Sequence, residues 1–394
     1  MATLHHNPVY INDMELMKAD IEAADTVFEL SNTSDNPNLL CIVGYEYAQA
    51  VEKSLRSIVR ADRKDIYNKA DRNGIRYVHK THDITALLGY AETCRPGLSA
   101  KHYYINKNAC KLNDFNNLRY GIASITRSEL HSLSLAAKAL VSELEQERLE
   151  KYADNEKNAR HSLEQWQNRP ETEFRAPKIK SEKQLQCSIS GPAIDLVDYD
   201  LLRAGVQAAD AILKASETSD NRYLLCLAGF HYGDTLQSAL KAIIKTDRPD
   251  IYFRKDSDGE LIFKNMHDMD KLMTKAGLCR PNIAAKYAYI AENSEQLQYI
   301  SRLRYGREST TKEEIRSLSM VVRSLVNELV TDFESMNPDQ RTNMKNTRKE
   351  WERRAKTDLR IPDDGKDFKF HLDDKNRTRN GIRLRNRGTE VKKI

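Results

Sequence analysis

The feature that most constrains this chain is a long internal repeat at a fixed spacing. Short landmarks in the first half recur 185 residues later in the second half. The matching pairs are Leu39-Leu40-Cys41 and Leu224-Leu225-Cys226, Asp65-Ile66-Tyr67 and Asp250-Ile251-Tyr252, His82-Asp83 and His267-Asp268, Cys94-Arg95-Pro96 and Cys279-Arg280-Pro281, Leu118-Arg119-Tyr120-Gly121 and Leu303-Arg304-Tyr305-Gly306, and Trp166 and Trp351. A constant spacing over most of a chain indicates one fold used twice. We therefore expect two similar modules packed as an internal pseudo-dimer, with further oligomerisation left open.

Within each copy, apolar residues recur at the three- and four-residue spacing of an amphipathic helix. The third helix of the first copy is expected to begin near His82-Asp83 and to end before Arg95-Pro96, because the residue before a proline resists the helical conformation. The other helices are expected at about 11–30, 37–61, 99–119 and 127–150, with equivalents that include 222–246, 284–304 and 312–335. Helices joined by such short connections indicate an up-and-down bundle.

A strand signal occurs at one place in each copy. Asn73-Gly74 and Asp258-Gly259 favour tight hairpin turns, and short apolar runs flank both. The flanking runs are Asp65–Tyr67 and Ile75–Val78 in the first copy, and Ile251–Arg254 and Leu261–Phe263 in the second. The predicted fold is therefore all-α, with two similar up-and-down helical bundles in tandem, each with a short β-hairpin insertion.

The repeat also sets the expected domain boundaries. The first copy covers residues 1–150 and the second covers residues 195–335. Residues 151–194 are expected to form a linker with a helical start that breaks at Arg169-Pro170, because proline disfavours helix at the residue before it. Residues 336–394 are expected to form a helical extension and a basic tail.

Positive charge is concentrated at the end of the chain. The formal net charge is +5, yet residues 375–394 hold eight Lys or Arg and one Glu, so this tail carries +7 and the rest sums to −2. A basic tail can bind RNA or DNA through phosphates without sequence preference, or it can be a solvated end. Its arginines are Arg377, Arg379, Arg383, Arg385 and Arg387.

Composition excludes several classes of protein. With 40% apolar and 31% charged residues, the chain is typical of a globular protein rather than a disordered or membrane protein, and we expect it in the cytoplasm. The six cysteines include no pair at zinc-ligand spacing, and the sequence has no glycine loop for phosphates. Neither a metal nor a cofactor is expected.

The landmarks resemble the HEPN superfamily of nucleotide-binding helical domains. The resemblance rests on a long second helix, a His-Asp at the start of the third and a Leu-Arg-Tyr just before the last, and it covers roughly residues 10–150 and 195–335. Many HEPN domains dimerise, so the resemblance implies that a duplicated chain builds the two-fold arrangement internally. It also implies a bacterial or phage setting, in defence or counter-defence.

HEPN members that cleave RNA carry an Arg followed closely by a His where two protomers meet. In that chemistry His accepts the proton of a ribose 2′-hydroxyl and Arg stabilises charge on the phosphate. Neither Arg119 nor Arg304 has a His at that spacing, and Arg127 and His131, four residues apart on one helix face, have Lys312 and Arg316 as their equivalents. The residues therefore favour binding over catalysis. The remaining candidates for a catalytic role are Arg119, Arg304, Arg127, His131 and His102.

The repeated Arg-Tyr pairs are the main candidates for ligand binding. Arg119-Tyr120 and Arg304-Tyr305 resemble the binding face of the family. The alternative is that each Tyr packs in the core while each Arg caps a helix C-terminus, where a cation is favourable.

Four further positions are weaker candidates. His82 and His267 can bind a ligand, although the Asp that follows each of them is explained by the helix dipole alone. Arg95 and Arg280 precede a proline at a helix end, so they either cap the helix or reach a phosphate.

The function that the sequence favours is a non-catalytic, tandem HEPN-like binding module. We expect it to recognise a nucleic acid, a nucleotide or a protein partner through the groove between the copies. The first alternative is a metal-independent, toxin-like endoribonuclease, and the second is a protein-binding scaffold, for which an exposed apolar groove would be the sign.

Overall fold

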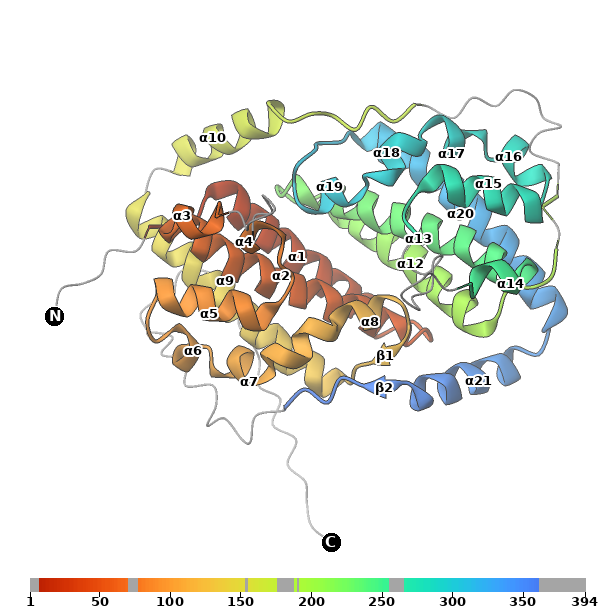
Figure 1. The fold of residues 1–394 in the computed structure, drawn as a ribbon, viewed down its shortest axis with the longest axis horizontal. Coiled ribbons are helices and arrows are strands. Elements are labelled where there is room, and N and C mark those ends of the chain that lie inside the picture. The colour runs from red at the N-terminus through yellow and green to blue at the C-terminus, as the bar shows by residue number, and fades with distance from the viewer. Residues whose placement is uncertain are drawn as a thin grey trace, which may run out of the picture. The chain divides into compact units, whose positions relative to one another are not determined.

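The computed structural model describes residues 7–69, 77–152, 155–175, 188–189, 191–254 and 266–360, all within one compact unit that spans residues 1–361. The described part is predominantly helical, as predicted, and Figure 1 shows its arrangement. The elements of the first half are α1 (Ile11–Leu30), α2 (Asn38–Asp62), α3 (Lys64–Tyr67), α4 (Tyr77–Lys80), α5 (Ile84–Cys94), α6 (Leu98–Lys101), α7 (Tyr103–Leu112), η1 (Asn113–Phe115), α8 (Asn116–Arg119), β1 (Ala123–Ser124), α9 (Arg127–Lys151) and α10 (Asn155–Gln167). Those of the second half are α12 (Leu196–Ala215), α13 (Tyr223–Asp247), α14 (Pro249–Tyr252), α15 (Met269–Cys279), α16 (Asn282–Lys286), α17 (Ala288–Glu292), α18 (Ser294–Gln298), α19 (Ser301–Arg304), α20 (Lys312–Met336), α21 (Gln340–Arg353) and β2 (Ala355–Lys356).

The long helices of the two halves have matching bounds. Helices α12, α13, α15 and α20 each begin 185 residues after α1, α2, α5 and α9, and the members of each pair have equal lengths. Their start signals match as well, because Thr126 and Thr311 each form a capping box with the Glu three residues later. The same local sequence signals therefore start the helices at equivalent residues in both halves.

Helices α2 and α13 form the centres of their halves, and most of their side chains are buried. A glycine in the middle of each lets neighbouring helices approach closely. A Cβ added at Gly44 would lie 2.9 Å from Leu118, and one added at Gly229 would lie 2.6 Å from Ile315. Alanine at either position therefore requires the side-chain end of Leu118 or Ile315 to shift, although it is the better helix former.

The two halves contact each other through reciprocal hydrogen bonds. Asn36 Nδ2 donates to the carbonyl of Asp200 at 2.7 Å, and Asn221 Nδ2 donates to the carbonyl of Glu15 at 2.9 Å. Asn221 and Asp200 are the 185-residue equivalents of Asn36 and Glu15. Each half thus presents the same donor and the same acceptor to the other, as an approximate two-fold axis requires.

The first half sends an arm, residues 155–175, onto the second half. Trp166 packs edge-on against Tyr223 with ring centroids 5.3 Å apart. Further along the arm, the backbone N–H of Phe174 donates to Glu314 Oε1 at 2.7 Å, and that of Arg175 donates to Asn293 Oδ1 at 2.6 Å. Phe174 is buried there, so this part of the predicted linker is an integral element of the second half.

The second half returns an equivalent arm, residues 340–360, onto the first half. Strand β2 pairs in parallel with β1, with Ala355 opposite Ala123. The N–H of Leu359 donates to Glu129 Oε1 at 2.6 Å, and that of Arg360 donates to Asn108 Oδ1 at 2.8 Å. Figure 1 shows α21 beside the second half, where it contacts α12, and β2 beside β1 of the first half. The two arms are therefore exchanged, with the same contacts at positions 185 residues apart.

The predicted hairpins are wrong in their first strands. Residues Asp65–Tyr67 lie in helix α3 and Ile251 and Tyr252 lie in helix α14. An Asp in the first turn of each helix, and a proline at the start of α14, favour helix over strand. Val78 lies in helix α4, whereas both turn dipeptides and the run Leu261–Phe263 lie outside the described residues.

The single helices predicted at 99–119 and 284–304 are also wrong. Each region consists of several short helices separated by residues with non-helical backbone angles, such as His102, Tyr287 and Asn293. Asn293 is fully buried, and its side chain bonds to the carbonyl of Tyr289 and to the backbone N–H of Arg175 in the arm. The equivalent residue Asn108 makes the same contacts within the unbroken helix α7, so docking of the arms does not by itself cause the interruptions.

Candidate functional site

The repeated arginines Arg119 and Arg304 meet at the contact between the halves. They end helices α8 and α19, and each reaches across to the opposite central helix. Arg119 forms a two-pronged ion pair with Asp234, with Nε 2.7 Å from Oδ2. Arg304 lies 3.3 Å and 3.4 Å from the two carboxylate oxygens of Glu46, and its Nε donates to Gln49 Oε1 at 3.2 Å.

Aromatic rings complete this arrangement, which we call the central cluster: Tyr45, Glu46, Gln49, Arg119, Phe230, His231, Asp234 and Arg304. The Arg304 guanidinium carbon lies 4.2 Å from the ring centre of Tyr45 and 4.6 Å from that of Phe230. The Arg119 guanidinium carbon lies 5.0 Å from the ring centre of Phe230. Tyr45 and Phe230 are equivalent residues, so two equivalent aromatic rings pack with two equivalent arginines.

Each buried or half-buried carboxylate of the central cluster is balanced by an arginine of the same cluster. Burial acts to raise the pKa of Glu46, but Arg304 above all, helped by His231 and Lys53, outweighs it and holds that pKa at about 2. Burial likewise acts to raise the pKa of Asp234, and Arg119 outweighs it, so this pKa lies below its ordinary value. Both carboxylates are therefore ionised at neutral pH.

A neighbouring charge pair exists only in the first half. Lys53 Nζ donates to Asp20 Oδ1 at 2.7 Å and to the carbonyl of Arg304 at 3.0 Å. Burial raises the pKa of Asp20 to about 7 and lowers the pKa of Lys53. The equivalent positions hold Gly205 and Ser238, so the second half lacks this pair.

Sequence reasoning missed Glu46, His231 and Asp234 in the central cluster. His231 Nε2 lies 3.1 Å from Glu46 Oε1, and these two residues are equivalent positions of the repeat. Glu46 and His231 are buried, and Asp234 is half-buried. The available signal was the presence of ionisable residues within the broad apolar stripes of two core helices.

The cluster does not provide a surface for cleaving RNA. Arg304 is 1% exposed and Glu46 is fully buried, so no external phosphate reaches either of them. Arg119 and Asp234 are each 18% exposed and are paired with each other. The geometry supports a structural role for both repeated arginines, in holding the two halves together.

The remaining catalytic candidates lie in structural contacts or apart from an arginine. His102 Nε2 lies 2.9 Å from Glu143 Oε2. The two terminal nitrogens of Arg127 donate to Asn32 Oδ1 and to the carbonyl of Ser31, in the turn after α1. His131 is exposed. Among the residues that the structure describes, no arginine forms a hydrogen bond with His131, so an Arg–His pair is not assembled there.

Arg95 and Arg280 are buried and bind their own chain. Arg95 donates to Asp62 Oδ2 at 2.8 Å and to Glu147 Oε2 at 2.5 Å. Arg280 donates to Asp247 Oδ2 at 3.0 Å and to the carbonyl of Pro192 at 2.6 Å. These contacts support capping and anchoring rather than phosphate recognition.

The two repeated histidines occupy equivalent contacts. His82 Nδ1 lies 3.0 Å from Glu52 Oε1, and His267 Nδ1 lies 3.0 Å from Gln237 Oε1. The Asp after each His caps helix α5 or α15 by accepting a backbone N–H at 3.0 Å. The ring of His82 lies 6.1 Å from that of Tyr305, so this His also borders the contact between the halves.

Two equivalent clefts open on either side of the central cluster. One cleft, which we call the inner lobe, has a volume of about 670 Å³. It lies between α1, α2 and α3 of the first half and the corner Tyr305-Gly306-Arg307 of the second half. The counterpart cleft, of about 280 Å³, lies between α12, α13 and α14 and the Tyr120–Ile122 corner of the first half. Tyr120 and Tyr305 thus each line a cleft in the opposite half.

The equivalent clefts differ in charge. The inner lobe is lined by six basic residues: Lys53, Arg56, Arg60, Lys64, Arg169 and Arg307. The equivalent positions hold Ser238, Lys241, Lys245, Pro249, Arg354 and Ile122. Three of these six equivalent positions are neutral. The walls of the counterpart cleft also include Leu201 and Phe253. One fold thus presents a cationic cleft on one side and a more apolar one on the other.

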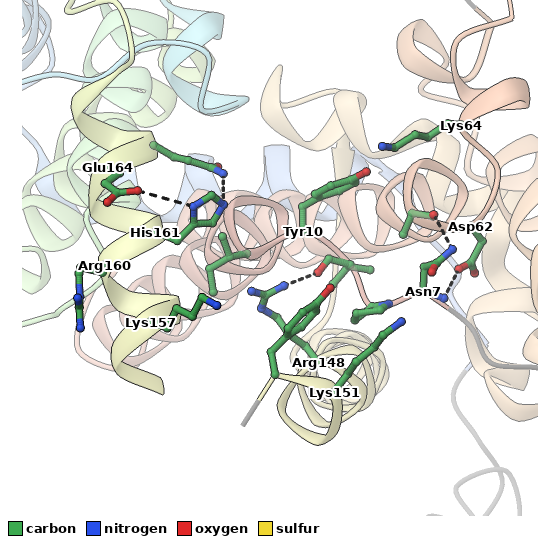
Figure 2. Close-up of a pocket in the computed structure, with 16 residues that line it drawn as sticks. Asn7, Tyr10, Asp62, Lys64, Arg148, Lys151, Lys157, Arg160, His161 and Glu164 are labelled. Atoms are coloured by element: carbon green, nitrogen blue, oxygen red, sulfur yellow. Dashed lines mark hydrogen bonds and ion pairs between the residues drawn. The ribbon is translucent and has the colours of Figure 1, made fainter. Parts of the chain in front are cut away.

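A second basic cavity adjoins the inner lobe. This outer lobe, of about 1270 Å³, shares Tyr10 and Lys64 with the inner lobe, and Arg148, Lys151, Lys157 and Arg160 also line it. Figure 2 shows Tyr10 at the centre of the outer lobe, with Arg148, Lys151 and Lys157 around it and Lys64 on the side of α3. We call the two lobes together the basic groove.

Several of the groove cations have no carboxylate partner among the described residues. Within the described ranges, Lys64, Lys151, Arg160, Arg169 and Arg307 form no ion pair with a carboxylate. Four of them are exposed, and Arg169 is half-buried. Arg60 is already paired with Asp13 at 2.7 Å and Arg56 with Glu52 at 2.5 Å, so these two contribute less.

The tail arginines Arg377, Arg379, Arg383, Arg385 and Arg387 lie outside the described residues. Over the described ranges, no helix is long and apolar enough to cross a bilayer, and no group of His, Cys, Asp and Glu side chains is arranged to hold a metal ion. No family model, no curated protein and no solved structure matches the chain.

Proposed function

We propose that this protein is a non-catalytic binding module, built from two HEPN-like helical bundles in tandem, that binds nucleic acid in the basic groove. The single observation that carries the proposal is the charge difference between equivalent positions of the repeat. Four exposed cations line the groove without a carboxylate partner among the described side chains. Solvation of the protein surface does not require these four cations to lie together in one concave region, whereas binding of a polyanion does.

The arm carries part of this charge. Lys157, Arg160 and Arg169 belong to the arm of the first half, and their equivalents are Thr342, Lys345 and Arg354. The inner lobe also needs Arg307 from the second half. The proposed site is therefore composite, which gives a physical reason for keeping both bundles in one chain.

Charge reversal in the groove is the test of this proposal. The variant Lys64→Glu, Lys151→Glu, Arg160→Glu is expected to bind a fluorescent oligonucleotide about a hundredfold more weakly near 0.1 M salt, with a smaller slope of log Kd against log salt. Fluorescence anisotropy over a salt series measures both quantities.

A matched control comes from the equivalent helix. Lys345, Arg348 and Lys349 are exposed on α21, and reversing all three changes the net charge by the same amount. This control is expected to bind within about threefold of the unaltered protein, since only long-range, salt-screened effects remain. Equal losses in both variants would reject the groove as the binding site.

The basic tail is a separate candidate for the same role. A chain that ends after residue 360 removes it without touching the groove. If the groove is the main site, this truncation reduces affinity less than the groove variant does. Unchanged affinity would remove the tail from the mechanism.

The nuclease alternative makes the opposite prediction for RNA integrity. Labelled RNA incubated with the protein and a chelator is expected to stay intact, because Arg119 and Arg304 are held in ion pairs between the halves. Cleavage that Arg119→Ala and Arg304→Ala abolish would favour the endoribonuclease instead.

A further inference from the structure

We infer that the ligand of the basic groove is a single strand of nucleic acid, with one unpaired base stacked on Tyr10. This inference rests on the proposed function and goes beyond it, since charge alone does not distinguish a single strand from a duplex, a mononucleotide or a base-free polyanion. Two features of the groove separate these ligands.

The first feature is the distribution of the cations. Lys64 lies where the two lobes meet, Lys151 and Arg160 line the outer lobe, and Arg169 and Arg307 line the inner lobe. A mononucleotide needs cations that converge on one phosphate group. Cations spread over two adjoining cavities instead match a backbone with a charge on every residue.

The second feature is the placement of the aromatic side chains. Tyr10 is half-buried and lines both lobes, and its ring lies 4.6 Å from the Arg60 guanidinium carbon and 5.5 Å from Lys64 Nζ. A half-buried ring beside cations can stack an unpaired base while neighbouring cations contact the flanking phosphates. In a duplex the faces of the bases are covered by their neighbours.

The aromatic and cationic positions differ together between the halves. The equivalents of Tyr10 and Tyr152, which both line the outer lobe, are Asp195 and Asn337. The equivalents of Lys64 and Lys151 are Pro249 and Met336. At these four positions, rings and charges are thus present in one half and absent from the other, as expected if one ligand uses both.

The experiment compares ligands on the full chain by anisotropy competition. The probe is a fluorescent single-stranded homopolymer of about twenty thymidines, a length that spans more than one typical single-strand site. Its competitors are an unlabelled single strand, a duplex of equal length, a nucleoside monophosphate and inorganic polyphosphate. The single strand is expected to compete at least tenfold better than each of the others, and replacing it with uridine RNA tests the contribution of the 2′-hydroxyl.

Variants at Tyr10 test the stacking itself. Tyr10→Leu is expected to weaken single-strand binding about tenfold and to leave polyphosphate binding unchanged, while Tyr10→Phe restores the single-strand affinity. The control is Tyr299→Leu, because Tyr299 is an exposed ring outside the groove with the Arg302 guanidinium carbon 3.9 Å from its centre. It is expected to have no effect.

The outcomes separate this inference from the proposed function. Equal competition by duplex or polyphosphate, with no effect of Tyr10→Leu, would overturn the single-strand assignment while the groove stays a polyanion site. No effect of the groove charge reversal would overturn both. A folded Tyr10→Leu variant, checked by its melting temperature, that loses single-strand and polyphosphate binding alike would also contradict stacking.

Discussion

Replacing Arg304 with Met is expected to lower the free energy of unfolding by about 3–5 kcal/mol. The variant leaves Glu46, which is fully buried, without the guanidinium that balances its charge. Chemical denaturation measures the change. The neighbouring variant Arg302→Met is the control, since Arg302 is 46% exposed and its ion pair with Glu308 is worth about 1 kcal/mol or less.

A second replacement tests the cause of this loss. In Arg304→Met, Glu46→Gln the uncompensated charge is absent, so most of the lost stability is expected to return. If the double variant is as unstable as the single one, packing of Arg304 against Tyr45 and Phe230 is the larger contribution.

The pH dependence of Arg304→Met follows from the lowered pKa of Glu46. In the unaltered protein this pKa is about 2, below its ordinary value of 4.5, so the stabilisation is fully present above pH 4.5 and is lost as the pH falls through 2. Without Arg304, burial raises the pKa of Glu46 relative to the unaltered protein. The deficit of the variant is therefore largest above pH 4.5 and shrinks toward pH 2.

Removal of the second arm is expected to cost about 2–4 kcal/mol of the free energy of unfolding. A chain that ends at Pro338 exposes the site of Leu359, which is 4% exposed in the intact protein, and leaves Glu129 and Asn108 without their backbone donors. Burial of one Leu and loss of such hydrogen bonds account for a change of this size.

A chain that ends at Ile361 provides the control for this truncation. It keeps the arm and removes the basic tail, so its unfolding is expected to match that of the full chain. Equal stability of the chains that end at Pro338 and Ile361 would show that the arm contributes nothing to the first half.

Much of the helical framework could be predicted from the sequence. The predicted helices at 11–30 and 127–150 correspond to α1 and α9, because apolar periodicity and the Thr126 capping box are local signals. The hairpin and the long helix at 99–119 could not be predicted correctly. In those regions short apolar runs suit helix and strand alike, and apolar periodicity gives no signal of the interruption at His102.

The candidate site was only partly predictable. The repeat identified Arg119 and Arg304, but their partners Asp234 and Glu46 depend on which faces of the two halves meet, which a single sequence does not specify. The basic groove was missed because charge was summed along the chain. Comparing position with position, Lys64 with Pro249 and Lys151 with Met336, would have located it from the repeat alone.

The exchange of arms explains why Trp166 packs against a residue of the other half. Its partner Tyr223 begins α13 of the other half, and the Arg354 side chain of the returning arm bonds to Asn38, the equivalent of Tyr223. A polar segment with few apolar residues gives no periodic signal of such an exchange. Each arm is held by specific hydrogen bonds and by a buried apolar side chain, Phe174 in one arm and Leu359 in the other.

The exchange of arms is tested most directly by native size-exclusion chromatography. The full chain is first cleaved at a protease site placed between residues 175 and 188. Since each arm docks on the opposite half, both fragments are expected to elute together at the size of the intact chain and to separate only in denaturant. Fragments that elute apart, or that each pair with a copy of themselves, would contradict the exchange of arms and the composite groove built on it.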